Sequence, residues 1–115
     1  MTKKITLLAT AIIMIAQITS ATVWRVNNRA NADADFTTIQ AAHDGATAGD
    51  TLYIEGSSAS YGNLTATKQL HIIGAGDFLN DNSETQAYKA VSTVGNIAFN
   101  AGSENSIIEG IRLTN

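Results

Sequence analysis

Apolar residues occur along the chain in short alternating runs, separated by glycine-rich and polar segments. Alternation of this kind is typical of half-buried β-strands, and clusters of Gly, Asn, Asp and Ser are typical of the turns between them. In the run Thr51-Leu52-Tyr53-Ile54, the Leu52 and Ile54 side chains share one face, so Tyr53 is predicted to point away from the core. Strands are expected at 23–27, 51–54, 64–67, 70–73, 96–100, 107–108 and 111–115.

One short helix is predicted between the first two strands. Thr37 is a candidate N-cap, and Gln40 stands three residues later, as in a capping box. Ile39 and Ala42 begin a narrow apolar stripe at helical spacing, and Gly45 provides a stop signal. A helix this short and weakly apolar is not stable alone, so we expect it to pack over another part of the fold.

Glycine recurs at the apolar ends of the predicted strands, at Ile54-Glu55-Gly56, Ile73-Gly74 and Ile108-Glu109-Gly110. Each unit is too small to bury its apolar face alone, and stacked units bury a continuous core, as in a solenoid. A small antiparallel β-sandwich also uses short strands and is the alternative.

Three stretches, at 35–42, 48–54 and 68–76, resemble the N-terminal entry of pectin-lyase-like right-handed β-helix proteins, and 106–115 resembles an ordinary coil of that fold. The resemblance implies an all-β fold, a truncated right-handed parallel β-helix (solenoid) with a short N-terminal capping α-helix. Residues 22–115 would then hold the cap and first coils. Family members include polysaccharide lyases, pectin esterases and non-catalytic surface proteins, but no position matches their catalytic motifs.

The N-terminus has the three-part layout of a secretory signal peptide. Lys3 and Lys4 form a basic start, an apolar run follows at 5–18, and small residues lead to a cleavage point near Ala21. The run is shorter than the roughly 20 residues that span a bilayer. A signal peptide at 1–21 and a secreted or cell-surface protein are therefore predicted, with an uncleaved membrane anchor as the alternative.

Composition narrows the function classes. The chain has no cysteine and a net charge of −3, which becomes −5 when Lys3 and Lys4 leave with the signal peptide. An acidic chain without a basic cluster argues against nucleic acid as a partner. The absence of cysteine excludes disulfides and thiolate metal sites.

No catalytic or cofactor-binding constellation is recognisable, so whether the chain is an enzyme stays open. The weak metal candidate is a calcium site formed by Asp77, Asp81 and Glu84, because carboxylate oxygens are ligands for Ca²⁺. His43 and His71 are expected to be unrelated surface residues.

Exposed aromatic rings are the remaining candidates, since sugars stack on them. Tyr53, Tyr61 and Tyr88 are the glycan-stacking candidates. The sequence thus predicts an exported structural or glycan-associated protein with polysaccharide as the partner. The alternative is the N-terminal part of a polysaccharide lyase or pectin-esterase-like enzyme whose catalytic residues lie beyond Asn115. Self-association or further coils are expected at the C-terminal end, where no cap is predicted.

Overall fold

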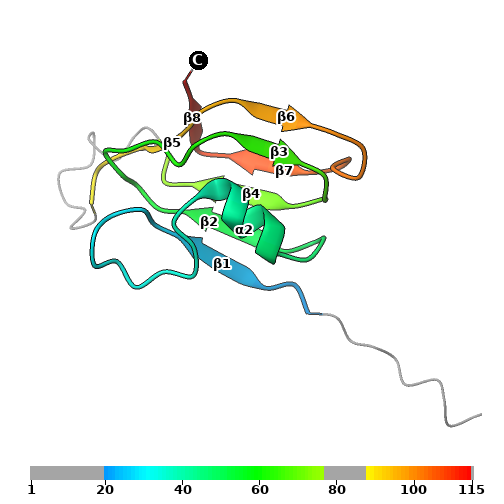
Figure 1. Ribbon diagram of the computed structural model, residues 1–115, viewed down its shortest axis with the longest axis horizontal. Helices are drawn as coiled ribbons and strands as arrows, with labels where there is room; N and C mark the ends of the chain where they lie inside the picture. Colours follow the sequence, from blue (N-terminus) through cyan, green and yellow to red (C-terminus); the bar gives the residue numbers. More distant parts are fainter. Residues whose placement is uncertain (1–19, 77–87, 115) are drawn as a thin grey trace, which may run out of the picture.

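The computed structural model describes residues 20–76 and 88–114 (Figure 1). Short strands and one helix make up its regular structure. They are β1 (Val23–Val26), α2 (Ile39–Gly45), β2 (Thr51–Ile54), β3 (Leu64–Ala66), β4 (His71–Gly74), β5 (Ser92–Val94), β6 (Ile97–Phe99), β7 (Ile107–Glu109) and β8 (Ile111–Leu113). Within the described residues, no helix is both long and apolar enough to cross a lipid bilayer.

The strands form three small parallel sheets. The largest has the order β1-β2-β4-β7, and the other two pair β3 with β6 and β5 with β8. Every pairing among these strands is parallel, which also rules out the antiparallel sandwich for the described residues.

The predicted right-handed β-helix solenoid is wrong for the part of the chain that the structure describes. A solenoid repeats one unit at a nearly constant period, whereas these strands form separate sheets of four, two and two strands. In the largest sheet, Thr51 pairs with Val23, 28 positions earlier, and with His71, 20 positions later. His71 pairs in turn with Ile107, 36 positions later. The recurring glycines therefore mark strand ends and define no repeat.

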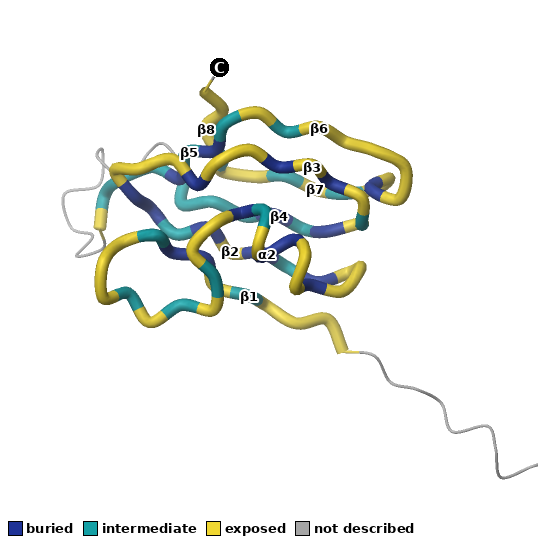
Figure 2. The backbone as a smooth tube through the Cα atoms, in the orientation of Figure 1, coloured by how far each residue is buried: buried dark blue, intermediate teal, exposed yellow. Residues whose placement is uncertain are grey.

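The core lies between the sheets and beneath α2 (Figure 2). Parallel pairing places Leu52 beside Ile72, and both side chains are buried. The Phe36 ring meets Trp24 edge-on, with the ring centroids 5.6 Å apart, and extends this core toward the helix. Alternating apolar residues thus bury one face of each central strand, as their spacing predicted.

Helix α2 begins one residue later than predicted, because Thr38 is the N-cap and its side chain accepts a hydrogen bond from the backbone N–H of Ala41. Gln40 does not complete a capping box; its Oε1 accepts from the Thr65 N–H at 2.8 Å and ties the helix to β3. The expectation that His43 lies on the surface is wrong. Its side chain is buried, and Nε2 accepts from the Thr67 N–H at 3.0 Å.

Candidate functional site

A surface cavity of about 260 Å³ brings charged and aromatic side chains together at the solvent face of the four-stranded sheet. Strands β1 and β2 contribute to its lining, and so do the segments that follow β1, β2 and β4. Tyr88, at the start of the segment 88–114, completes it. The lining residues are Arg25, Arg29, Tyr53, Glu55, Gly56, Ala75 and Tyr88.

The strand register positions the first two groups. Arg25 of β1 pairs with Tyr53 of β2, so the guanidinium and the ring project from neighbouring positions on the same face. Trp24 and Val26, which alternate with Arg25, turn toward the core instead. The Tyr53 side chain is 40% exposed, which confirms the predicted outward orientation of this ring.

Glu55 and Arg25 are locked to each other. Arg25 donates to Oε1 of Glu55 from Nε at 3.0 Å and from Nη2 at 2.8 Å, and Asn27 Nδ2 donates to Oε2. Arg25 also donates from Nη1 to the Asp33 carbonyl oxygen at 2.8 Å. Burial raises the pKa of Glu55, but the hydrogen bonds from Asn27 and Arg25 outweigh burial and leave the pKa below its ordinary value. Glu55 is therefore an anionic anchor for the wall of the cavity.

Arg29 is the cavity residue whose terminal guanidinium nitrogens have no hydrogen-bond partner among the described residues. Its guanidinium carbon lies 4.3 Å from the centroid of the Tyr88 ring, a cation–π arrangement. Its Nε donates weakly to Oδ1 of Asn27 at 3.4 Å. Neither Nη1 nor Nη2 of Arg29 donates a hydrogen bond to another residue in 20–76 or 88–114. Both nitrogens can thus donate to a bound molecule.

Close packing of the backbone brings Tyr88 to the cavity. A Cβ atom at Gly56 would overlap the carbonyl oxygen of Ala90, so glycine lets the two segments touch. The Ser57 N–H donates to the Val91 carbonyl oxygen at 3.1 Å and fixes this contact. The Tyr88 side chain remains 48% exposed, as a stacking platform requires.

Tyr61 does not belong to this site, and its prediction as a glycan-stacking ring is wrong. The side chain is 1% exposed and lies in the core. Its hydroxyl donates to the backbone carbonyl oxygen of Glu55 at 2.6 Å. Burial raises the pKa of Tyr61, so the hydroxyl keeps its proton and the hydrogen bond. Tyr61 supports the cavity from behind without reaching a ligand.

The calcium candidates Asp77, Asp81 and Glu84 lie outside the described residues. Within those that are described, no group of three His, Asp or Glu side chains is arranged to hold a metal ion. The sequence did not predict the contact between His71 and Glu109. Nε2 of His71 lies 3.1 Å from Oε2 of Glu109, because β4 pairs with β7. This exposed pair does not line the cavity.

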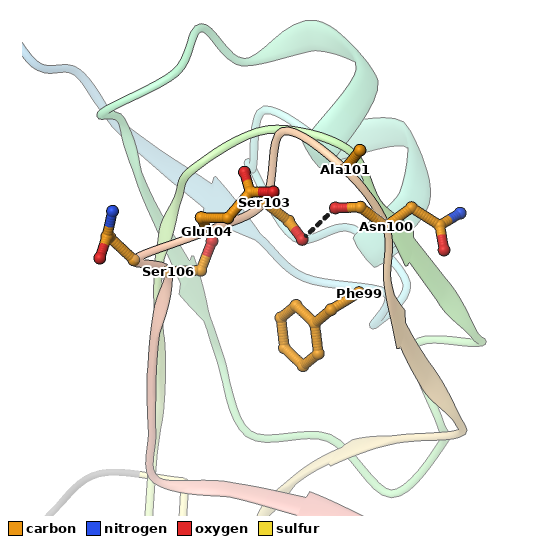
Figure 3. Close-up of a pocket in the computed structure, with 7 residues that line it drawn as sticks. Phe99, Asn100, Ala101, Ser103, Glu104 and Ser106 are labelled. Atoms are coloured by element: carbon orange, nitrogen blue, oxygen red, sulfur yellow. Dashed lines mark hydrogen bonds between the residues drawn. The ribbon is translucent and has the colours of Figure 1, made fainter.

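A second cavity, of about 570 Å³, lies where the turn at 100–106 connects β6 to β7 (Figure 3). The Phe99 ring faces short polar side chains across it, and the Ser103 hydroxyl donates to the Asn100 carbonyl oxygen at 2.6 Å. It combines a single ring with a single charged side chain, Glu104. The smaller cavity offers two rings and two guanidinium groups, and is therefore the stronger candidate.

Sequence patterns revealed Tyr53 and Tyr88 but not the charged residues beside them. Arg25, Arg29 and Glu55 carry no motif, and only the pairing of β1 with β2 shows that they share one cavity. No protein-family model, curated protein or solved structure matches this chain.

Proposed function

We propose that the chain is an exported glycan-binding protein whose site is the cavity between Tyr53 and Tyr88. The observation that carries the proposal is the meeting of two exposed rings and an available guanidinium at one concave site. Its apolar and polar groups suit a molecule that has an apolar ring face and many hydroxyls. Sugars have both features.

The tyrosine rings, Arg29 and the Glu55–Arg25 pair would each contribute differently to binding. A tyrosine ring offers an apolar face with a partial negative charge, on which the C–H groups of a pyranose ring can lie. Arg29 offers planar N–H donors to hydroxyl or carboxylate oxygens. Glu55 and Arg25 are already paired, so their part is to hold the wall of the cavity in place.

The size of the cavity favours one sugar unit and weak binding. Its volume of about 260 Å³ is below the roughly 300–1,000 Å³ of pockets that enclose drug-sized ligands. At about 0.3 kcal/mol for each non-hydrogen atom, a hexose would bind with a Kd on the order of millimolar. A polysaccharide with many such units would bind more tightly through avidity.

Export is the second part of the proposal. It is supported by the signal-peptide pattern at 1–21, most of which lies outside the described residues. The alternative of a polysaccharide-degrading enzyme remains a prediction of the resemblance, and no contact among residues 20–76 and 88–114 favours it.

A glycan microarray followed by NMR titration of the selected sugar tests the proposal. We expect Tyr53→Ala and Tyr88→Ala each to weaken binding about fivefold, since a stacking contact contributes on the order of 1 kcal/mol. Arg29→Ala should weaken binding by a similar factor. Phe99→Ala is the matched control, because this ring is also exposed but lies outside the cavity.

Two results would contradict the proposal. One is a folded wild-type chain that binds no glycan at millimolar concentration. The other is binding that Phe99→Ala reduces as strongly as Tyr53→Ala does, which would place the sugar at the other cavity.

A further inference from the structure

Asp50 is a buried carboxylate that gathers three N–H donors around its two oxygens. Oδ1 accepts from the backbone N–H of Thr22 at 2.9 Å. Oδ2 accepts from Nε1 of Trp24 and from the backbone N–H of Thr47, each at 2.9 Å. The residue is 5% exposed, and these hydrogen bonds hold its pKa below the ordinary value, the bond from Thr22 most of all.

Thr22 is the residue that follows the predicted cleavage point after Ala21. Before cleavage, its nitrogen is a neutral peptide N–H. Hydrolysis adds the oxygen of water to the Ala21 carbonyl carbon, breaks the C–N bond and leaves the Thr22 nitrogen as an α-ammonium group. That ammonium has three donors and a full positive charge where the amide had one donor.

We propose that Asp50 is a receptor site for the N-terminal ammonium that removal of the signal peptide creates. The inference depends on the export part of the proposed function and is independent of glycan binding. Cleavage would convert a hydrogen bond from a neutral amide to the carboxylate, at 2.9 Å, into a hydrogen-bonded ammonium–carboxylate ion pair. The folded state would therefore gain stability at the moment of processing.

The surroundings of Asp50 suit this role. A cavity of about 380 Å³ lies beside the carboxylate and is lined by the turn at 47–50 and by Ser20, Ala21 and Thr22. Ser20 and Ala21 leave with the signal peptide, so the new terminus at Thr22 has space on this side to orient its donors. The other charged group that acts on Asp50 is Lys68, whose ammonium is held by the carbonyl oxygens of His43, Asp44 and Ala46. Asp50 thus has no competing ammonium in hydrogen-bond contact among the described residues.

The attraction between the Thr22 ammonium and the Asp50 carboxylate makes the stability of the processed chain depend on pH. An α-ammonium beside a buried carboxylate has a higher pKa in the folded state than the value of about 7.7–8.0 it has when unfolded. The stabilisation is then complete below about pH 7 and is lost as the pH rises through the folded-state value.

The test compares two exported products of the full chain, both verified by mass. One begins at Thr22, and the other keeps one extra residue, Ala21, because its cleavage site is moved one position earlier. We expect the longer product to have an unfolding equilibrium constant about tenfold higher at pH 7, equivalent to about 1.4 kcal/mol. The difference should disappear at high pH.

Asp50→Asn supplies the control. In this background the extra residue should change the unfolding constant less than twofold, which completes a double-mutant cycle. If Asp50→Asn does not fold, the pH dependence of the difference decides in its place.

Equal stability of the two products at pH 7 would overturn the inference and leave glycan binding untouched. An exported product that begins at a residue other than Thr22 would overturn it as well. A chain that stays uncleaved would overturn both this inference and the export part of the proposed function. Glycan titration of the same samples reports separately on the binding part.

Discussion

Ser92 connects three parts of the core through one hydroxyl. It is fully buried, donates to the Ile54 carbonyl oxygen at 2.6 Å and accepts from the Ala75 N–H at 2.7 Å. The end of β2 and the end of β4 are thereby joined to β5. Removing this hydroxyl would take away the hydrogen-bond partner that the Ile54 carbonyl oxygen and the Ala75 N–H share.

We expect Ser92→Ala to lower the free energy of unfolding by about 1–3 kcal/mol, because the Ile54 carbonyl oxygen and the Ala75 N–H both lose this hydrogen-bond partner. Urea denaturation measures the change. Ser58→Ala is the control at an exposed serine and should cost less than about 0.5 kcal/mol. Equal effects of the two substitutions would show that the Ser92 hydroxyl contributes nothing specific.

Glu55 should make the free energy of unfolding depend on pH in the acidic range. Its pKa is lowered in the folded state, so its contribution is present above the ordinary glutamate value and is lost as the pH falls through the folded-state value. We expect Glu55→Gln to lower the free energy of unfolding by about 1 kcal/mol at pH 7, since Arg25 is partly exposed. The difference from wild type should shrink as the pH falls through the folded-state value. A difference that does not change as the pH is lowered would mean that shape, not charge, matters here.

At the scale of elements, helix α2 depends on a single lysine at its C-terminal end. The Lys68 ammonium donates to the carbonyl oxygens of His43 at 2.7 Å, Asp44 at 3.1 Å and Ala46 at 2.6 Å. These oxygens have no partner inside a short helix, and the negative end of the helix dipole favours a cation there.

We expect Lys68→Met to lower the free energy of unfolding by about 1–2 kcal/mol. Amide hydrogen exchange should locate the change, with protection lost first in α2. Lys89→Met is the matched control, a partly buried lysine outside the helix. A uniform loss of protection over all sheets would contradict a local role for Lys68.

The elements themselves were largely predictable from the sequence. Strands with strong alternation, such as 51–54, form as expected, because one buried face fixes their conformation. Strand β5 (Ser92–Val94) escaped prediction, since its inward residue Ser92 is polar and breaks the apolar alternation. The solenoid was wrong because strand pairing joins residues at unequal separations, which no local pattern reveals.

The candidate site was predictable only in part. Tyr53 could be identified from alternation, because its neighbours Leu52 and Ile54 are buried. Tyr61 was misassigned, because its hydroxyl finds a backbone carbonyl inside the core, and a tyrosine whose hydroxyl is satisfied can be buried. Arg25 and Glu55 meet only after β1 pairs with β2, so their role required the tertiary structure.

At the scale of the whole molecule, β6, β7 and β8 each lie at the edge of their sheet. Phe99 pairs with buried Ala66, and Leu113 pairs with buried Val94, yet both large side chains are more than half exposed. At the opposite edge of the largest sheet, the outer side of β1 is occupied by a bridge between Val26 and Phe36. Among the described residues no further strand covers these edges, and strand edges with apolar side chains favour association between chains.

We therefore expect sedimentation velocity to show self-association that rises with protein concentration. Phe99→Asp and Leu113→Asp should weaken it about tenfold or more, because a charge would enter an apolar contact. Val23→Asp is the matched control, an exposed apolar residue on β1. A wild-type chain that stays monomeric at all concentrations, or a Val23→Asp variant as impaired as the others, would contradict this expectation.

The unequal spacing of the paired strands also has a kinetic consequence. Pairing β2 with β4 closes a loop of 20 positions, whereas pairing β4 with β7 closes one of 36. The longer closure costs about 0.5 kcal/mol more chain entropy, and the β4–β7 contact also requires β4 to be in place. Within the four-stranded sheet, pairing should therefore begin between β2 and β4, with β7 joining late, so that mutations at Ile72 slow folding while those at Ile108 mainly accelerate unfolding.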